Sequence, residues 1–132
     1  MGDGNEMNIR PKSDCGCSAD ATILLACSGA SDVGEIADRA ARMLRNDGVG
    51  KMSCLIGIAT GVEDIASKVR AACKILVIDG CSTECGKKAM QQGGIDRYLH
   101  LRLDDLGMEK GKTPATQERI EEVVIRASQM LA

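Results

Sequence analysis

Short apolar runs alternate with stretches of helical periodicity along the chain. Residues 21–27 form an apolar run bounded by Ser-Gly, as expected for a strand that is buried on both faces of a sheet. From Val33 the apolar residues recur at helical spacing until Gly48, a residue that favours the left-handed cap of a helix. Repeated strand–helix units of this kind favour a parallel sheet with helices on its faces.

Further strand-like runs follow at residues 51–58, 74–78 and 98–103. The last run alternates apolar and polar residues, which predicts a half-exposed edge strand with His100 on its solvent-facing side. Four units joined by right-handed crossovers predict an α/β fold of the flavodoxin or Rossmann type. We expect a three-layer sandwich with a four-stranded parallel sheet in the order 2-1-3-4.

Capping residues predict where the helices begin. Ser31 would cap the first helix, and Thr113 would cap the closing helix. Ser82 or Thr83 would cap the helix that follows the third strand. For the helix after the second strand, the spacing predicts an inward face made of Val62, Ile65, Ala66 and Val69.

A chain of 132 residues is large enough to bury one apolar core without disulfides or metal clips. The polar residues 1–20 predict a flexible lead-in, and residues 21–132 predict a single domain. The lead-in lacks the apolar centre of a signal peptide, and no apolar run reaches membrane-spanning length. We therefore expect a cytoplasmic protein with no membrane partner.

Charge and aromatic content narrow the choice of partner. The net charge is −2 with both signs interspersed, which gives no basic patch for nucleic acid. Tyr98 is the only aromatic residue, so stacking of bases on aromatic side chains is nearly excluded. An ion, a small molecule or a protein is the expected partner.

Seven cysteines are many for this length, and their odd number in a reducing compartment favours metal binding or thiol chemistry. Cys27 and Cys81 would end neighbouring strands at the carboxyl edge of the sheet, where such sheets bind their ligands. Cys85 follows in the first turn of a helix, whose N-terminus favours a thiolate. Zinc held by thiolates in a structural site takes four donors, and Cys54 is the candidate for the fourth. The pattern therefore predicts a zinc site.

The other cysteines and Asp79 also have explanations that do not involve binding a metal. Any single buried cysteine has plain packing as an equally good interpretation. Cys73 precedes the third strand and belongs to the opposite edge, so it is not a ligand candidate. Cys15 and Cys17 would be extra ligands, a metal-delivering arm or idle residues of the lead-in. Asp79 would orient a ligand or serve as an ordinary turn residue.

Three motifs resemble those of the DGC domain family, which is named for its Asp-Gly-Cys triplet. They are CSGASDVG at residues 27–34, GKMSCL at residues 50–55 and DGCSTEC at residues 79–85. The resemblance covers roughly residues 15–100 and implies zinc binding, with an undefined cellular role. It implies four cysteine ligands, which match Cys27, Cys54, Cys81 and Cys85.

A cysteine-dependent phosphocarrier or phosphatase-like enzyme is one alternative. Ser28, Gly29 and Ser31 follow Cys27 at a strand-to-helix turn, where backbone N–H groups can hold phosphate. The phosphatase pattern requires an Arg six residues after the cysteine, where this chain has Val33. A phosphocarrier loop, which needs no Arg, is therefore the closer match.

A thiol redox protein is the other alternative. In that case Cys27 or Cys81 would attack a substrate disulfide and Cys85 would resolve the mixed disulfide. A Cys-x2-Cys pair would suit this role better than the spacing found here. Both alternatives stay open beside the zinc site.

Overall fold

The computed structural model describes residues 22–132, and within them it contains one four-stranded parallel sheet. The strands are β1 (Thr22–Ala26), β2 (Lys51–Met52), β3 (Lys74–Asp79) and β4 (Leu99–Arg102), in the order β2-β1-β3-β4. The predicted sheet and strand order are confirmed. The predicted flexible segment, with Cys15 and Cys17, lies outside the described residues.

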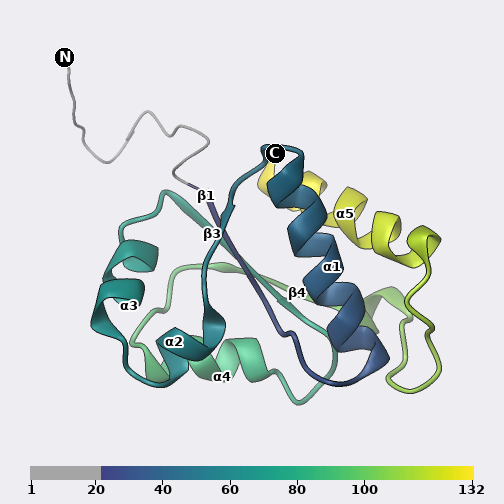
Figure 1. Cartoon of the computed structure of the whole chain (residues 1–132), viewed down its shortest axis with the longest axis horizontal. Helices are drawn as coiled ribbons and strands as arrows, with labels where there is room; N and C mark the ends of the chain where they lie inside the picture. Colours follow the sequence, from purple (N-terminus) through teal and green to yellow (C-terminus); the bar gives the residue numbers. More distant parts are fainter. Residues whose placement is uncertain (1–21) are drawn as a thin grey trace.

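Helices cover both faces of the sheet, which confirms the three-layer α/β sandwich (Figure 1). On one face lie α1 (Asp32–Asn46) and α5 (Gln117–Leu131), and on the other lie α2 (Leu55–Ala59), α3 (Glu63–Arg70) and α4 (Cys85–Gln92). A short 3-10 helix, η2 (Leu103–Leu106), follows β4. None of the helices in residues 22–132 has the length and apolar character needed to cross a membrane.

The two central strands contribute to a core on each face. In β1, Leu24 packs into the core under α1 and α5, and Leu25 packs into the core under the other helices. Both side chains are fully buried, and each such burial contributes roughly 1.5–3 kcal/mol. Ala26 of β1 pairs with Ile78 of β3, and the Cys27 N–H donates to the Ile78 carbonyl at 2.9 Å. This register fixes where the chain leaves β1 with Cys27.

The second strand is much shorter than predicted. Residues 51–58 were expected to form one strand, but β2 ends at Met52 and the apolar run that follows forms α2. The Cys54 thiol caps this helix by accepting a hydrogen bond from the Gly57 N–H at 3.4 Å. In a strand, Ile56 and Ile58 would share one face, whereas here Ile58 is buried and Ile56 is 69% exposed.

Several predicted helix starts need correction, although two signals are confirmed. Ser31 caps α1 as predicted, with its Oγ accepting from the Gly34 N–H at 3.1 Å. Gly48, beyond the end of α1, has the expected positive φ of 80°. The cap of α5 is Thr116 rather than Thr113, because the Thr113 hydroxyl is buried and donates to the Glu109 carbonyl at 2.8 Å.

The starts of α3 and α4 also differ from the prediction. Val62 precedes α3 as its N-cap and is 43% exposed, so it is not part of the inward face. Glu84 occupies the N-cap of α4 with a left-handed φ of 56°, in place of Ser82 or Thr83. Its side chain makes no capping hydrogen bond, so the α4 N–H groups depend on another acceptor.

The first turn of α1 lies very close to the loop that carries Cys27. A Cβ at Gly34 would lie 2.7 Å from the Gly29 carbonyl oxygen, and a Cβ at Gly80 would lie 2.8 Å from Cγ2 of Val33. Both distances are well below van der Waals contact, so these positions require glycine for close approach. The two glycines allow the Cys27 loop to pack between α1 and the end of β3.

Gly34→Ala is expected to lower the free energy of unfolding by about 2 kcal/mol, because the added methyl group overlaps the Gly29 backbone. Better helix propensity returns at most about 1 kcal/mol. Urea denaturation followed by circular dichroism measures the difference. Glu35→Ala, at the exposed next position, is the control and should cost no more than about 0.5 kcal/mol through its ion pair with Arg39. A G34A variant as stable as wild type would contradict this packing.

Candidate functional site

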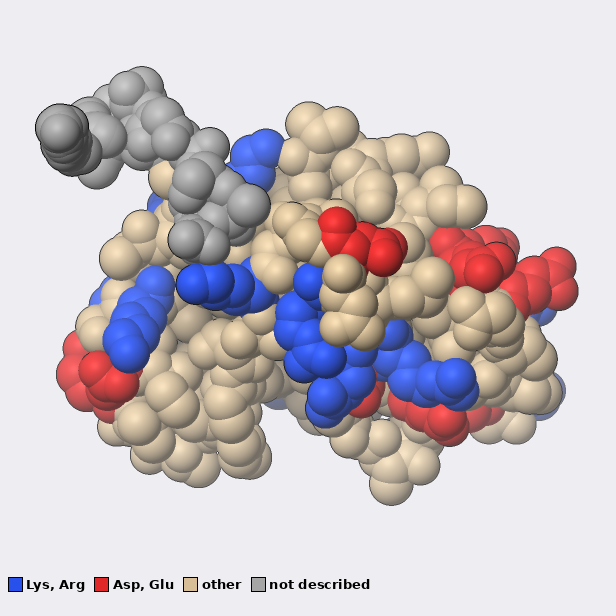
Figure 2. All heavy atoms as spheres, turned by 45° about the horizontal axis from the view of Figure 1, so that its top comes forward, with Lys and Arg blue, Asp and Glu red and all other residues tan. Residues whose placement is uncertain are grey.

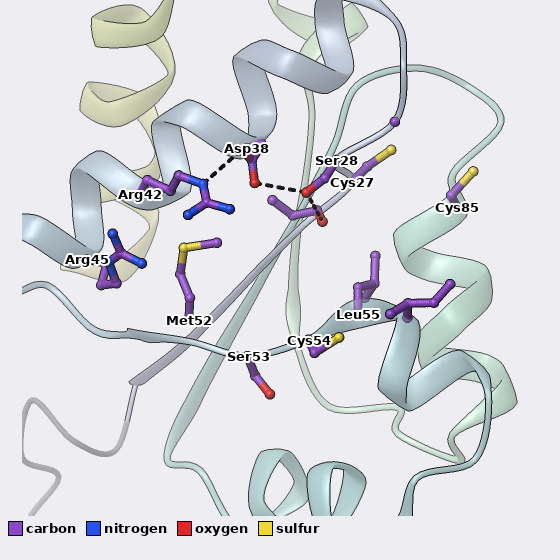
Figure 3. Close-up of a pocket in the computed structure, with 13 residues that line it drawn as sticks. Cys27, Ser28, Asp38, Arg42, Arg45, Met52, Ser53, Cys54, Leu55 and Cys85 are labelled. Carbon is purple, nitrogen blue, oxygen red and sulfur yellow. Dashed lines mark hydrogen bonds and ion pairs between the residues drawn. The ribbon is translucent and has the colours of Figure 1, made fainter.

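Three of the four predicted metal ligands line one cleft at the carboxyl edge of the sheet (Figure 3). Cys27 follows β1, Cys54 follows β2, and Cys85 begins α4. The cleft has a volume of about 710 Å³. We call it the thiol cleft and define it by Cys27, Cys54 and Cys85 together with Ser28, Asp38, Arg42, Arg45, Met52, Ser53, Leu55 and Ile56. Three segments that are distant in sequence thus each contribute a cysteine to the lining of one cleft.

Cys81, the fourth predicted ligand, lines a different cleft. This second cleft has a volume of about 550 Å³ and is also lined by Thr83, Asp104 and Lys110. Among residues 22–132, no group of three or more Cys, His, Asp or Glu side chains is already arranged to hold a metal ion. The predicted ligands therefore gather near one edge of the sheet without forming an assembled four-cysteine site.

The thiols of the two clefts differ in acidity. Burial is the main reason why the pKa of the Cys27 thiol is raised, and the negative charges of Cys85 and Asp79 add to the effect. Hydrogen bonds from the side chain and backbone of Thr83 hold the pKa of the Cys81 thiol below its usual value. Cys27 and Cys85 lie on the same side of the thiol cleft (Figure 3), which is why Cys85 contributes to this shift in the Cys27 pKa.

The carboxylate of Asp79, at the end of β3, is buried and connects three elements. Its Oδ1 accepts a hydrogen bond from the Gly86 N–H at 2.7 Å, and its Oδ2 accepts one from the Lys87 N–H at 3.1 Å. Nε2 of His100 on β4 lies 2.8 Å from the same Oδ2. Asp79 thus satisfies two N–H groups at the start of α4 in place of a capping side chain. It fixes the position of Cys85, the first residue of α4.

The turn before α4 is also held by close packing and by β4. A Cβ at Gly86 would lie 2.6 Å from Cγ1 of Val77 and 2.8 Å from Oδ1 of Asp79, so this position requires glycine. The Glu84 carboxylate lies 3.3 Å from Nη1 of Arg102 on β4. This ion pair is partly buried, and it ties down the residue that has the left-handed backbone conformation.

The expectation of simple solvent exposure for His100 is wrong. Its side chain is 21% exposed and contacts Asp79. Val77 of β3 pairs with His100, and Asp79 pairs with Arg102, which places the His100 ring diagonally beside the Asp79 carboxylate. Sequence periodicity indicates the face of a strand but not its register with a neighbour. No signal in the sequence therefore pointed to the pairing of Asp79 with His100.

The loop considered as a phosphate cradle has a carboxylate beside it. The Ser28 hydroxyl donates to Asp38 at 2.9 Å, and Asp38 also accepts from Nε of Arg42 at 2.9 Å. Burial acts to raise the pKa of Asp38, but hydrogen bonds from Arg42 and Ser28 bring it below its usual value. Ser31 is engaged as the cap of α1. The two hydroxyl groups of this loop are therefore already engaged by partners within the protein, which disfavours their use in holding a phosphate.

Fold and site together define a small α/β protein with thiols at the carboxyl edge of a parallel sheet. The model of the DGC domain family matches residues 23–127, and the chain belongs to this family. It is similar to the anaerobic and virulence modulator AnvM of Pseudomonas aeruginosa, with 32% identity over 88 residues. This alignment covers 67% of the chain and 67% of AnvM. No solved structure matches the chain.

Asp79→Ala is expected to lower the free energy of unfolding by about 3 kcal/mol, because it leaves the Gly86 and Lys87 N–H groups without their acceptor. Asp79→Asn retains one acceptor oxygen and should cost about half as much. Chemical denaturation measures both. The exposed Asp96→Asn is the control and should change stability by less than about 0.5 kcal/mol. Equal stability of D79A and wild type would contradict the capping role.

Cys81 is expected to react with iodoacetamide at lower pH than Cys27, because the thiolate is the reactive form and the two pKa values are shifted in opposite directions. Peptide mass spectrometry after short pulses across a pH series gives a midpoint for each thiol. Thr83→Val removes the hydroxyl donor and should move the Cys81 midpoint to higher pH, with no change at Cys27. A lower midpoint for Cys27 than for Cys81 would contradict the assignment.

Proposed function

We propose that this DGC-domain protein binds zinc in the thiol cleft, with Cys27, Cys54 and Cys85 as its protein ligands. The observation that carries the proposal is the convergence of these three thiols, from three separate chain segments, on one cleft. Cys81 belongs to the four-cysteine set predicted from the sequence, but it is the weaker candidate because it lines the second cleft. Three protein ligands would leave one zinc position open to an external ligand.

The donor chemistry supports zinc. Thiolates are ligands that Zn²⁺ prefers, and a bound cation stabilises the ionised form of a thiol whose pKa is otherwise raised, as at Cys27. Cys54 and Cys85 are exposed. The Cys85 side chain can therefore rotate toward Cys27, whereas rotation of the Cys54 side chain would also give up its capping hydrogen bond from the Gly57 N–H. Binding would require such rotations, since the thiols of residues 22–132 are not already grouped around one point.

A thiol–disulfide function is the second candidate, with Cys27 and Cys85 as the pair. The observation that favours it is the position of both residues on the same side of the thiol cleft. Exchange with a substrate disulfide would join the two sulfurs and pass two electrons and two protons to the substrate, which leaves as two thiols. A redox pair made of Cys81 and Cys85 is less favoured, because these two thiols line different clefts.

Metal analysis of the full chain, purified under reducing conditions without chelator, tests the zinc proposal. We expect about one zinc per chain. Cys27→Ser, Cys54→Ser and Cys85→Ser should each lose most of it, whereas Ser53→Ala, which changes the same cleft without removing sulfur, should retain it. Circular dichroism of each variant checks that it is folded.

Two results would count against the three-ligand site. A folded wild-type chain that neither carries zinc nor takes it up from a competing chromophoric chelator would contradict zinc binding. Loss of zinc in Cys81→Ser to the same extent as in Cys85→Ser would instead support the four-cysteine set. Formation of a Cys27–Cys85 disulfide in the zinc-free chain, reversible by dithiothreitol, would support the redox candidate.

A further inference from the structure

The thiol cleft has two chemically different ends. Figure 3 shows Cys27 and Cys85 on one side of the cleft, and Arg42 and Arg45 on the other. Both arginines belong to the later turns of α1 and lie one helical turn apart. Zinc alone would not require the arginines, since a guanidinium group is not a metal ligand. The positive end of the cleft therefore calls for a separate explanation.

Both guanidinium groups retain donors that the described residues do not use. Arg42 binds Asp38 through Nε at 2.9 Å, and its two terminal nitrogens make no other hydrogen bond within residues 22–132. Arg45 donates from Nε and Nη2 to Asn46, at 3.3 and 3.2 Å. Asp38 offsets one of the two positive charges. The remaining charge and the unused forked donors suit a carboxylate, which accepts two parallel hydrogen bonds from a guanidinium group.

Basic side chains gather on one face of the molecule. The chain as a whole has a net charge of −2, so a basic region has to be local. Figure 2 brings forward the side of the molecule where α1 ends, and Lys and Arg side chains gather in the middle of that face.

The middle of the cleft restricts the ligand to a small, flexible molecule. Met52, Leu55 and Ile56 provide an apolar surface between the two ends. The volume of about 710 Å³ is in the range of small-molecule sites. No aromatic side chain lines the cleft, so there is no platform for stacking a nucleobase or another flat ring.

We propose that the thiol cleft binds a low-molecular-weight thiol that carries carboxylate groups. Its carboxylate pairs with Arg42 and Arg45, its short aliphatic part lies against Met52 and Leu55, and its sulfur lies among the three cysteines. The sulfur contact rests on the proposed function, because a thiol is a suitable external ligand for the zinc position that three cysteines leave open. The thiol proton would pass to solvent, and the sulfur would supply the fourth donor to a zinc ion held by Cys27, Cys54 and Cys85.

Titration of the full-length, zinc-loaded protein with reduced glutathione, followed by ¹⁵N NMR, tests the proposal. We expect saturable shifts at α1 and at the three cysteines. Two probes separate the contributions: S-methylglutathione keeps the carboxylates without a free thiol, and 2-mercaptoethanol keeps the thiol without a carboxylate. Each should bind at least about fivefold more weakly than glutathione, because each loses one of the two anchors.

A double variant, Arg42→Gln with Arg45→Gln, tests the anion end. It should weaken glutathione binding by about tenfold and leave the zinc content unchanged. Arg39→Gln is the matched control, because Arg39 lies on the same helix and does not line the thiol cleft, although it shares a neighbouring cleft with Arg42. The affinity of this variant should stay within about twofold of wild type. Equal affinity of the double variant and wild type would overturn the proposal, and so would equal affinity for glutathione and S-methylglutathione.

The same experiment distinguishes failure of this inference from failure of the proposed function. If the wild-type chain holds zinc but the arginine variants bind glutathione normally, the inference is wrong and the zinc site stands. If the chain holds no zinc yet binds glutathione in an arginine-dependent way, the carboxylate contact stands and the sulfur contact at zinc is wrong.

Discussion

The buried carboxylate of Asp79 is the interaction on which the site depends. Burying a charge costs several kcal/mol unless donors compensate for the lost water, and here two backbone N–H groups of α4 and the ring of His100 provide them. The same contacts tie β3, α4 and β4 together at one point. Cys85 begins α4 and is therefore held at a defined place beside Cys27, although its own side chain is exposed.

The architecture could be predicted from the sequence, because burial of a strand or of one helix face requires apolar residues at regular positions. Residues 23–26 of β1 and 75–78 of β3 are all apolar, and α1 and α5 carry regular apolar stripes, so the three-layer sandwich and strand order were predictable. The end of the second strand could not be predicted, because the apolar residues that follow Met52 fit a buried strand and a buried helix equally well. The local cap by Cys54 favours a helix, and the packing of α2 against α3 and α4 buries Ile58 while Ile56 stays exposed.

The candidate site was predictable only where the sheet topology determines it. The ends of β1, β2 and β3 bring Cys27, Cys54 and the loop with Cys81 and Cys85 to one edge, and this followed from the strand order. The distribution of the thiols over two clefts did not follow, because it depends on the conformation of the turn before α4. The left-handed backbone at Glu84 and the contact between Asp79 and His100 involve register and tertiary packing, which spacing along the chain does not encode.

Each residue of the Asp-Gly-Cys triplet has a different structural role. The side chain of Asp79 anchors α4, Gly80 allows the turn to pack against Val33, and Cys81 lies in the second cleft. The thiols of the two clefts differ because Cys27 is disfavoured as an anion and Cys81 is favoured. A cation in the thiol cleft would compensate for the burial of Cys27, whereas Cys81 ionises more readily without one. Metal and pH would therefore act on different cysteines of the same short edge.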